Sequence, residues 1–381
     1  RTRQQKRTTG GNYMKLLDTN ERERAIVVGL VSGKVRKEKV EEYLDELILL
    51  ADTAGADVCH TITQERERIN SATFIGSGKA EEIGKLVEDE KIDLVIFDDD
   101  LSPVQIRNLE KLISCTILDR SGLILDIFAS REKRKEAMTQ VELAQLQYQL
   151  PRLTRQWTHL SKQYGGVGTK GPGETQIETD RRAIRTKISH LKEKLERISN
   201  EREVQRKGRK EQSRVALVGY TNAGKSTLLR LLSGADVLVE DRLFATLDST
   251  VRQVDLGPGK TILLSDTVGF IRKLPSHLIA SFRSTLAEVS EAHILLHVID
   301  ISHPHFREHI NVVNGTLEGL NASGKPTIHV FNKIDKLKDR SVILELKDEY
   351  PSSVFISAER GISISTVTDM LRELLERDGI E

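Results

Sequence analysis

Short apolar runs and amphipathic stretches alternate along the first third of this 381-residue chain. Residues 25–30 and 92–97 are apolar runs rich in β-branched side chains, which is typical of buried strands. Between them, apolar side chains recur at three- and four-residue spacing over residues 39–51 and predict an amphipathic helix. The alternation of strands and helices predicts a mostly parallel α/β domain, which we assign to residues 14–130.

The remaining elements of this domain follow from the same patterns. Strands are expected at residues 57–64 and 116–119, and helices at residues 81–88 and 103–112, the latter started by Ser102 and Pro103. The segment Phe74–Lys79, FIGSGK, could be a phosphate loop, although a glycine turn before a helix is the plainer interpretation. Asp98, Asp99 and Asp100 could hold a metal ion or form a solvated strand end.

Residues 131–211 follow a heptad pattern instead. Two apolar seams with alternating three- and four-residue spacing run through this region. They consist of Leu143, Leu146, Leu150, Leu153, Trp157 and Leu160, and of Ile184, Ile188, Leu191, Leu195 and Ile198. Two such helices around a short loop predict an antiparallel coiled-coil hairpin, and Pro151 is expected to kink the first helix.

The hairpin region is also strongly basic. It holds 20 Lys and Arg against 11 Asp and Glu, whereas the whole chain has a net charge of +1. Its loop, residues 161–173, has five glycines, and cationic residues surround it: Arg152, Arg155, Lys162, Lys170, Arg181, Arg182 and Arg185. Cations that meet phosphates, glycines that approach a backbone, and Trp157 and Tyr164 as stacking platforms suit structured RNA. A mobile linker on a solvated hairpin accounts for the pattern equally well.

Residues 212–381 alternate between strands and helices again. Strands are expected at residues 214–218, 251–256, 262–265, 293–299, 327–331 and 354–356. Helices are expected at residues 227–232, 276–289, 308–320, 342–349 and 363–375. This pattern predicts a six-stranded doubly wound sheet that binds its ligand at the carboxyl ends of the strands.

The first strand of this domain runs into a phosphate-binding motif. Its eight residues fit G-x-x-x-x-G-K-[ST] and are Gly219, Tyr220, Thr221, Asn222, Ala223, Gly224, Lys225 and Ser226. The glycines let backbone N–H groups turn toward phosphates, and the start of the following helix adds its positive dipole end. Lys225 is expected to reach the β- and γ-phosphates, and Ser226 is expected to bind Mg²⁺.

Three further motifs follow in order and predict that the ligands are GTP and GDP. They are Asp266, Thr267, Val268 and Gly269; Asn332, Lys333, Ile334 and Asp335; and Ser357 with Ala358. Asp266 can hold Mg²⁺ through water, and the N–H of Gly269 can sense the γ-phosphate. Asp335 can accept hydrogen bonds from guanine N1–H and N2–H₂, which adenine cannot offer. A backbone N–H of the Ser357–Ala358 loop can meet guanine O6.

This ordered set resembles the G domain of the translation-factor-related GTPases. The resemblance makes Leu243–Asp248 the first switch, with Thr246 as its Mg²⁺-binding threonine. The nucleotide-binding residues of this switch are then Phe244, Ala245, Thr246, Leu247 and Asp248. Lys225, Thr246 and Gly269 are the residues expected to carry hydrolysis. Phe270 stands where Ras-like proteins place a glutamine that orients water, so we predict slow intrinsic hydrolysis that a partner stimulates by ordering the switches.

Asn222 matches the phosphate-loop asparagine of potassium-activated GTPases that also lack the glutamine. A K⁺ ion beside the β- and γ-phosphates could supply the missing positive charge. The alternative is that Asn222 merely fits the turn.

From Met14 onward, the chain closely resembles the HflX family. Two segments carry this resemblance: Gly165–Gly173 followed by ETQIETDRR, and Phe74–Lys79 followed by AEEI. The resemblance implies a cytoplasmic GTPase that binds the large ribosomal subunit and splits or rescues stalled ribosomes. It also implies that the hairpin loop points to ribosomal RNA near the peptidyl transferase region. ATP binding by the amino-terminal domain is implied too, but no adenine-reading motif is present there.

Composition sets the remaining bounds. Cys59 and Cys115 lack metal or redox spacing, so a reducing cytosol is expected. No apolar run approaches the length of a membrane span, and no signal-peptide pattern is present. Met14 is expected to be the natural start and residues 1–13 an appended tail; a native disordered basic tail is the alternative. The rival functions are a GTP switch for a protein partner and an RNA-remodelling or ribosome-assembly GTPase.

Overall fold

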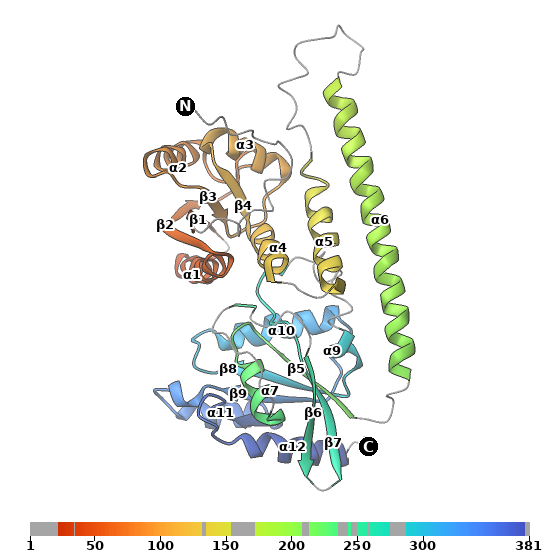
Figure 1. The fold of residues 1–381 in the computed structure, drawn as a ribbon. Helices are drawn as coiled ribbons and strands as arrows, with labels where there is room; N and C mark the ends of the chain where they lie inside the picture. Colours follow the sequence, from red (N-terminus) through yellow and green to blue (C-terminus); the bar gives the residue numbers. More distant parts are fainter. Residues whose placement is uncertain are drawn as a thin grey trace, which may run out of the picture. The chain divides into compact units, whose positions relative to one another are not determined.

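A computed structural model describes most of the chain (Figure 1). The described residues are 22–33, 35–131, 135–153, 172–207, 213–234, 243–244, 250–257, 259–274 and 287–377. The chain divides into two compact units, residues 1–131 with 144–186 and residues 132–143 with 187–381. Over the described residues, no helix combines the length and the apolarity that crossing a membrane requires.

The first unit contains a parallel four-stranded sheet in the order β2-β1-β3-β4. Its strands are β1 (Glu23–Ser32), β2 (Ala56–Arg66), β3 (Leu94–Phe97) and β4 (Thr116–Asp119). Its helices are α1 (Lys37–Ala54), α2 (Ser77–Glu90), α3 (Pro103–Ile113) and α4 (Arg120–Arg131). Apolar side chains of β1, β3, α2 and α3 form one buried core. The parallel α/β sheet predicted for this region is confirmed.

Local sequence sets the start of α3 but gives no sign of α4. Ser102 Oγ accepts from the N–H of Gln105 at 3.3 Å, and Gln105 Oε1 accepts from the N–H of Ser102 at 2.8 Å. Pro103 takes the first helical position, where its missing N–H costs nothing. The hydrophobic pattern did not predict α4, because most of its residues are buried and no single apolar stripe marks a helix.

The region predicted as a hairpin forms α5 (Lys135–Gln149) and α6 (Pro172–Lys207). The predicted seam along α6 is confirmed, because its members are less exposed than most of their neighbours: Ile184, Ile188, Leu191, Leu195 and Ile198. Lys187 Nζ lies 2.6 Å from a carboxylate oxygen of Glu142 and joins the two helices. The predicted kink at Pro151 is wrong. α5 instead ends at Gln149, since a proline disfavours the helical conformation of the residue before it.

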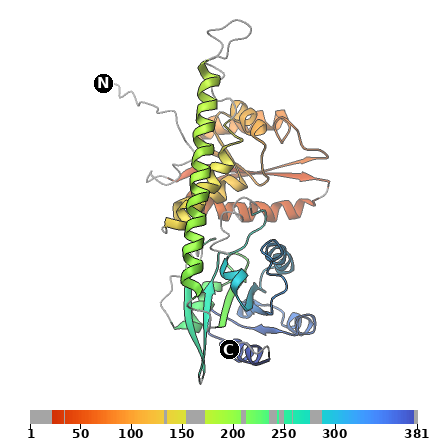
Figure 2. The ribbon, with the colours of Figure 1, turned by 90° about the vertical axis from the view of Figure 1, so that its right-hand side faces the viewer.

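The second unit contains a six-stranded sheet in the order β10-β9-β8-β5-β7-β6. Its strands are β5 (Ser213–Gly219), β6 (Thr250–Gly257), β7 (Lys260–Asp266), β8 (Ile294–Asp300), β9 (Thr327–Asn332) and β10 (Ser353–Phe355). β6 is antiparallel to β7, and the other neighbours are parallel. Both ribbon views show the β6–β7 hairpin at one edge of the sheet (Figures 1 and 2).

Helices cover this sheet and complete the predicted doubly wound fold, which is confirmed. They are α7 (Lys225–Ser233), α9 (Ala287–Glu291), α10 (Phe306–Gly319), the short 3₁₀ helix η3 (Ile334–Lys336), α11 (Ser341–Glu349) and α12 (Ile364–Arg377). Apolar residues of the central strands, α7 and α12 share one core, which holds the carboxyl ends of the strands in place. Most of the helix expected at residues 276–289 lies outside the described residues.

Candidate nucleotide-binding site

The loop between β5 and α7 passes so close to its neighbours that two positions require glycine. Gly219 has φ of 153°, and a Cβ there would lie 2.2 Å from the carbonyl oxygen of Val298. Gly224 has φ of 95°, and a Cβ there would lie 2.2 Å from the side-chain nitrogen of Asn332. The two glycines therefore let the loop curve tightly against the ends of β8 and β9.

The side chain of Lys225 packs against this loop. This side chain is buried, and Nζ donates to the carbonyl oxygens of Tyr220 at 2.9 Å and Gly219 at 3.2 Å. Burial lowers the pKa of the Lys225 ammonium to about 8, while the nearby carboxylate of Asp266 acts to raise this pKa. The positive charge thus lies in a poorly solvated position, where phosphate groups would stabilise it.

Ser226 and Asp266 bring together oxygen atoms that could hold Mg²⁺. Ser226 Oγ donates to Asp266 Oδ2 at 2.6 Å, and the Asp266 side chain is fully buried. A hydroxyl and a carboxylate are the hard oxygen donors that Mg²⁺ favours, so the two residues fit this ion. When bound, Mg²⁺ would neutralise charge on the phosphates. Thr246, the other expected ligand, lies outside the described residues.

Asn332 and Lys333, at the end of β9, fasten this region to the phosphate loop. Asn332 Nδ2 donates to the carbonyl oxygen of Ala223 at 2.9 Å. Lys333 Nζ donates to the carbonyl oxygen of Asn222 at 2.9 Å and lies 2.6 Å from a carboxylate oxygen of Asp300. The structure therefore brings the first and third predicted motifs into direct contact.

Asp335 has the properties needed to accept hydrogen bonds from a guanine base. Its side chain is only 5% exposed, and Arg360 Nε lies 3.5 Å from Oδ2. Oδ1 is buried and has no hydrogen-bond partner among the described residues. A hydrogen bond from Ser357 is the main reason why the pKa of Asp335 lies below its ordinary value. The carboxylate is thus kept ionised and offers an acceptor to a pair of N–H donors.

The Ser357–Ala358 loop lies beside this region, but its N–H groups are engaged within the protein. The N–H of Ala358 donates to Asn332 Oδ1 at 2.9 Å, and the N–H of Ser357 donates to the carbonyl oxygen of Ile362 at 3.2 Å. Contact with guanine O6 would require one of these bonds to be shared or exchanged.

The residues after β7 pair with the phosphate loop. The N–H of Phe270 donates to the carbonyl oxygen of Gly219 at 3.0 Å, and the N–H of Thr221 donates to the carbonyl oxygen of Phe270 at 2.8 Å. Gly269 packs so closely that a Cβ there would lie 2.8 Å from Thr221 Cα. The structure therefore places Gly269 directly against the loop that precedes Lys225.

Several predicted site residues lie outside the described part of the chain. They are Ala245, Thr246, Leu247 and Asp248 of the first switch, and Arg155, Lys162 and Lys170 around the glycine-rich loop. Phe244 is described and is buried. On α6, Arg182 and Arg185 are exposed, whereas Arg181 is half-buried.

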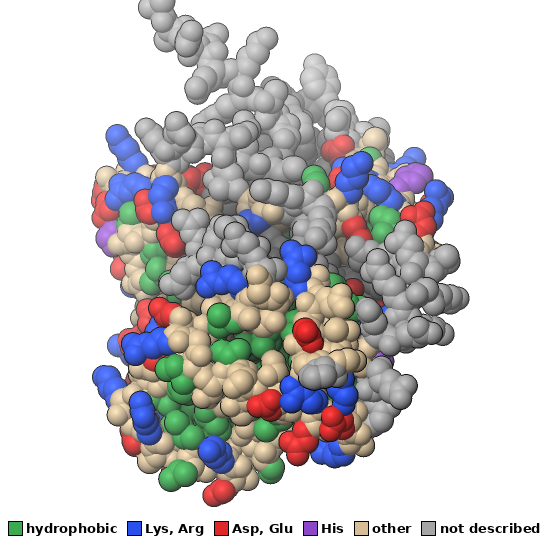
Figure 3. Space-filling view, turned by 60° about the horizontal axis from the view of Figure 1, so that its bottom comes forward, with side chains coloured by type: hydrophobic (Ala, Val, Ile, Leu, Met, Phe, Trp, Pro, Cys, Tyr) green, Lys and Arg blue, Asp and Glu red, His purple; other side chains and the backbone are tan. Residues whose placement is uncertain are grey.

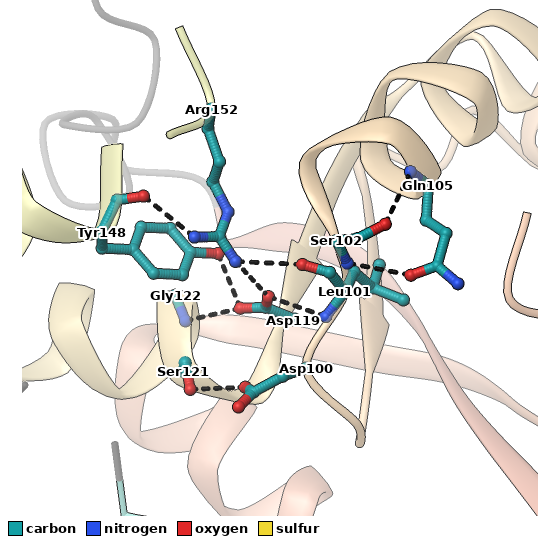
Figure 4. A network of polar contacts seen from close by, with 9 residues as sticks. All are labelled: Asp100, Leu101, Ser102, Gln105, Asp119, Ser121, Gly122, Tyr148 and Arg152. Carbon is teal, nitrogen blue, oxygen red and sulfur yellow. Dashed lines mark hydrogen bonds and ion pairs between the residues drawn. The ribbon is translucent and has the colours of Figure 1, made fainter. Parts of the chain in front are cut away.

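Arg152, one of the cationic residues near the predicted hairpin loop, is bound within the first unit (Figure 4). Its guanidinium lies 2.9 Å from Asp119 Oδ2 and also donates to the carbonyl oxygens of Tyr148 and Leu101. The fully buried Asp119 carboxylate accepts further hydrogen bonds from the Tyr148 hydroxyl at 2.6 Å and from the N–H groups of Gly122 and Leu101. A charge satisfied in this way by a buried carboxylate is not available to a phosphate.

Asp98, the first of the three aspartates at the end of β3, is neither a metal ligand nor solvated. Asp98 is buried, and Arg120 Nη1 lies 2.7 Å from its carboxylate, while the same guanidinium also contacts Glu46. Within the described residues, no group of His, Cys, Asp or Glu has the arrangement of a metal site. The sequence signal that could have revealed this pair is an arginine directly after β4, the strand that neighbours β3.

The glycine-turn interpretation of Phe74–Lys79 is supported. Gly76 precedes the first residue of α2, and its N–H donates to Gln64 Oε1 at 2.8 Å. A Cβ on Gly76 would lie 2.6 Å from a guanidinium nitrogen of Arg66. The space before this helix is thus occupied by side chains of β2.

The sheet order of the second unit and its strand–loop–helix arrangement define a P-loop GTPase domain. Three family models match the chain in succession. They describe the GTP-binding GTPase N-terminal region at residues 41–129, the GTP-binding GTPase middle region at residues 131–209, and a 50S ribosome-binding GTPase at residues 214–333.

Two relatives and one solved structure extend this similarity to most of the chain. GTPase HflX of Flavobacterium psychrophilum is 54% identical over 320 residues, which are 84% of this chain and 77% of the relative. GTPase HflX of Escherichia coli is 45% identical over 342 residues, 89% of this chain and 80% of the relative. The crystal structure of an SsGBP and GDP complex is 25% identical, with a TM-score of 0.51, and covers 93% of this chain and 99% of that one. The chain belongs to the HflX family of GTPases, and it is an enzyme that hydrolyses GTP.

Proposed function

We propose that this GTPase binds the large ribosomal subunit through its basic hairpin and splits or rescues stalled ribosomes in the cytoplasm. The observation that carries the proposal is the exposure of Arg182 and Arg185 on α6, close after the glycine-rich loop. On the face shown in Figure 3, basic and acidic side chains are interspersed. In the hairpin sequence, by contrast, basic residues outnumber acidic ones. The description of the model that matches residues 214–333, a 50S ribosome-binding GTPase, supports the same partner.

In this proposal the chain has three working parts: an amino-terminal α/β domain (14–130), the hairpin (131–211) and the GTPase domain (212–381). The hairpin contacts ribosomal RNA near the peptidyl transferase region, and the GTPase domain responds to the γ-phosphate. Because linkage is reciprocal, the large subunit should tighten GTP binding if GTP favours the ribosome-bound state.

Lys225, Gly269 and Thr246 carry hydrolysis in this proposal. The Lys225 ammonium stabilises negative charge on the β- and γ-phosphates, and the N–H of Gly269 donates to the γ-phosphate. Phe270 is fully buried and cannot orient the attacking water, so the protein alone hydrolyses GTP slowly. Ordering of the first switch around Thr246 by the ribosome then raises the rate.

Potassium is the proposed source of additional positive charge. Asn222 supports this role, because its side chain is exposed on the phosphate loop while Lys333 holds its carbonyl oxygen at 2.9 Å. Turnover should therefore be faster in K⁺ than in Na⁺ buffer, and Asn222→Ser should remove the difference. Equal turnover of the unaltered protein in the two buffers would exclude potassium activation.

The hairpin contact can be tested by comparing two double variants of α6, each of which removes two positive charges from a different part of the helix. The double variant Arg182→Gln, Arg185→Gln should bind purified large subunits more weakly and with a shallower salt dependence. The matched control is Lys192→Gln, Arg197→Gln, which removes two exposed charges farther along α6. An equal loss of affinity in both variants would show that binding depends only on the net charge of α6. Unchanged affinity in both variants would overturn the proposed contact.

The two rival functions predict different behaviour toward free ribosomal subunits and intact 70S ribosomes. An RNA-remodelling or assembly GTPase would bind free subunits but leave intact 70S ribosomes associated. A GTP switch for a protein partner would bind neither particle in a way that depends on Arg182 and Arg185. Sedimentation of 70S ribosomes with the protein and GTP separates splitting from both rivals, because only splitting releases the two subunits.

A further inference from the structure

Three histidines and the side chain of Tyr220, a residue of the phosphate loop, form a cluster, and the roles proposed so far use none of these side chains. The ring of Tyr220 stacks on the ring of His309 in α10, with centroids 3.8 Å apart and planes inclined by 6°. The ring of His303 lies 4.4 Å from that of His309, and His303 Nδ1 accepts from the N–H of His305 at 3.2 Å. The described residues contain no set of metal ligands here, so the role of the cluster follows from what Tyr220 contacts.

Tyr220 contacts Lys225, the residue expected to reach the γ-phosphate, and Arg272 in the segment after β7. Its carbonyl oxygen accepts from Lys225 Nζ at 2.9 Å, and its hydroxyl accepts from the N–H of Arg272 at 3.0 Å. Its backbone also forms a parallel bridge with Phe270. The residue is only 8% exposed. The hydroxyl bond is therefore largely shielded from water, which strengthens it.

The backbone from Gly269 to Arg272 is held at both ends by the phosphate loop. Phe270 pairs with the loop backbone at the near end, and the Tyr220 hydroxyl binds Arg272 at the far end. Between them, Gly269 lies so close to Lys225 that a Cβ there would be 3.1 Å from Nζ. Small displacements of this backbone would therefore change the distance between Gly269 and Lys225, on which the reaction geometry depends.

The position of the Gly269–Arg272 backbone matters for GTP hydrolysis because this chain has Phe270 in place of a water-orienting glutamine. With no polar side chain at that residue, the water and the γ-phosphate must be oriented by other groups, among them the N–H of Gly269. We infer that Tyr220 is a positioning residue for GTP hydrolysis. Its hydroxyl holds Arg272, the stacked ring of His309 holds Tyr220, and together they fix Gly269 relative to Lys225.

The test is Tyr220→Phe, which removes one hydroxyl and keeps the ring that stacks on His309. Loss of one shielded hydrogen bond to the segment is expected to lower kcat for GTP by about three- to tenfold. KM for GTP and the affinity for GDP should change by less than about twofold, because neither depends on the exact position of Gly269 in the transition state. The matched control is Tyr350→Phe, which removes a half-buried hydroxyl elsewhere in the same unit and should leave kcat unchanged.

A second pair of variants tests the support from α10. His309→Phe keeps a ring that can stack on Tyr220 and should retain most of kcat, whereas His309→Ala removes the stack and should lower kcat as Tyr220→Phe does. An unchanged kcat in Tyr220→Phe would overturn the inference. So would a fall in kcat accompanied by an equal fall in GDP affinity, since this would show a general defect of the loop. Both readouts are made without ribosomes, so they are independent of the proposed partner.

Discussion

The side-chain amide of Asn332 joins the phosphate loop to the loop that follows β10. Its Nδ2 donates to the carbonyl oxygen of Ala223, and its Oδ1 accepts from the N–H of Ala358, both at 2.9 Å. The side chain is 2% exposed, so water cannot easily replace either bond. Asn332 therefore fixes the phosphate loop and the Ser357–Ala358 loop relative to each other.

Asn332→Ala should weaken GTP and GDP binding together. The substitution leaves a buried carbonyl and a buried N–H without partners, each costing about 1–3 kcal/mol. We expect affinities for both nucleotides to fall by at least about tenfold, measured with fluorescent GTP and GDP analogues. Asn311→Ala, on the exposed face of α10, serves as the control and should leave both affinities unchanged. A loss confined to GTP would contradict this role for Asn332.

Asp335→Asn should change the preferred base. The carboxylate can accept hydrogen bonds from the two N–H donors of guanine, whereas an amide presents one acceptor and one donor, which suits the extra carbonyl of xanthine. Competition between GTP and xanthosine triphosphate for the variant measures the change. If GTP still wins by its original margin, Asp335 does not read the base.

Lys225 should take up a proton when nucleotide binds in mildly alkaline solution. Burial lowers its pKa to about 8 in the free protein, and phosphates should return this pKa toward its ordinary value above 10. At pH 8.5 we therefore expect uptake of about half to one proton, and the affinity should fall as the pH rises further. Calorimetry in two buffers with different ionisation enthalpies measures this uptake. Binding without proton exchange at that pH would show that the lysine is already fully charged.

Asp119→Asn should destabilise the first unit strongly. The substitution leaves the guanidinium of Arg152 beside a neutral partner in a largely buried position, which costs about 3–5 kcal/mol. Chemical denaturation followed by circular dichroism measures the free energy of unfolding. The control is Asp57→Asn, whose ion pair with Arg22 at 2.8 Å is largely exposed and should matter little. Similar losses in the two variants would contradict the importance of burial.

The order of the four nucleotide motifs was sufficient to predict the fold of the second unit, because each motif comes at the end of a recognisable strand. The limits of β4 also agree with the prediction. The contacts of Asp119 with Tyr148 and Arg152 could not be predicted, since they join residues from separate elements whose packing no local pattern describes. The stack of Tyr220 on His309 escaped prediction for the same reason.

The helix α4 and the end of α5 show two other limits. α4 is buried on most sides and therefore lacks the periodic pattern by which amphipathic helices are recognised. The heptad pattern of α5 continues in the sequence beyond Gln149, but the backbone restriction from Pro151 ends the helix there. Apolar spacing shows which side chains can share a face, and it does not show where the helix stops.

GTP turnover with and without purified large ribosomal subunits, in potassium buffer, tests the central claim most directly. The account predicts slow turnover by the protein alone and a large stimulation by the subunits. The stimulation should fall in the variant with Arg182→Gln and Arg185→Gln. Turnover that is the same with and without large subunits would contradict the claim, because it would remove the ribosome as the partner that completes the site.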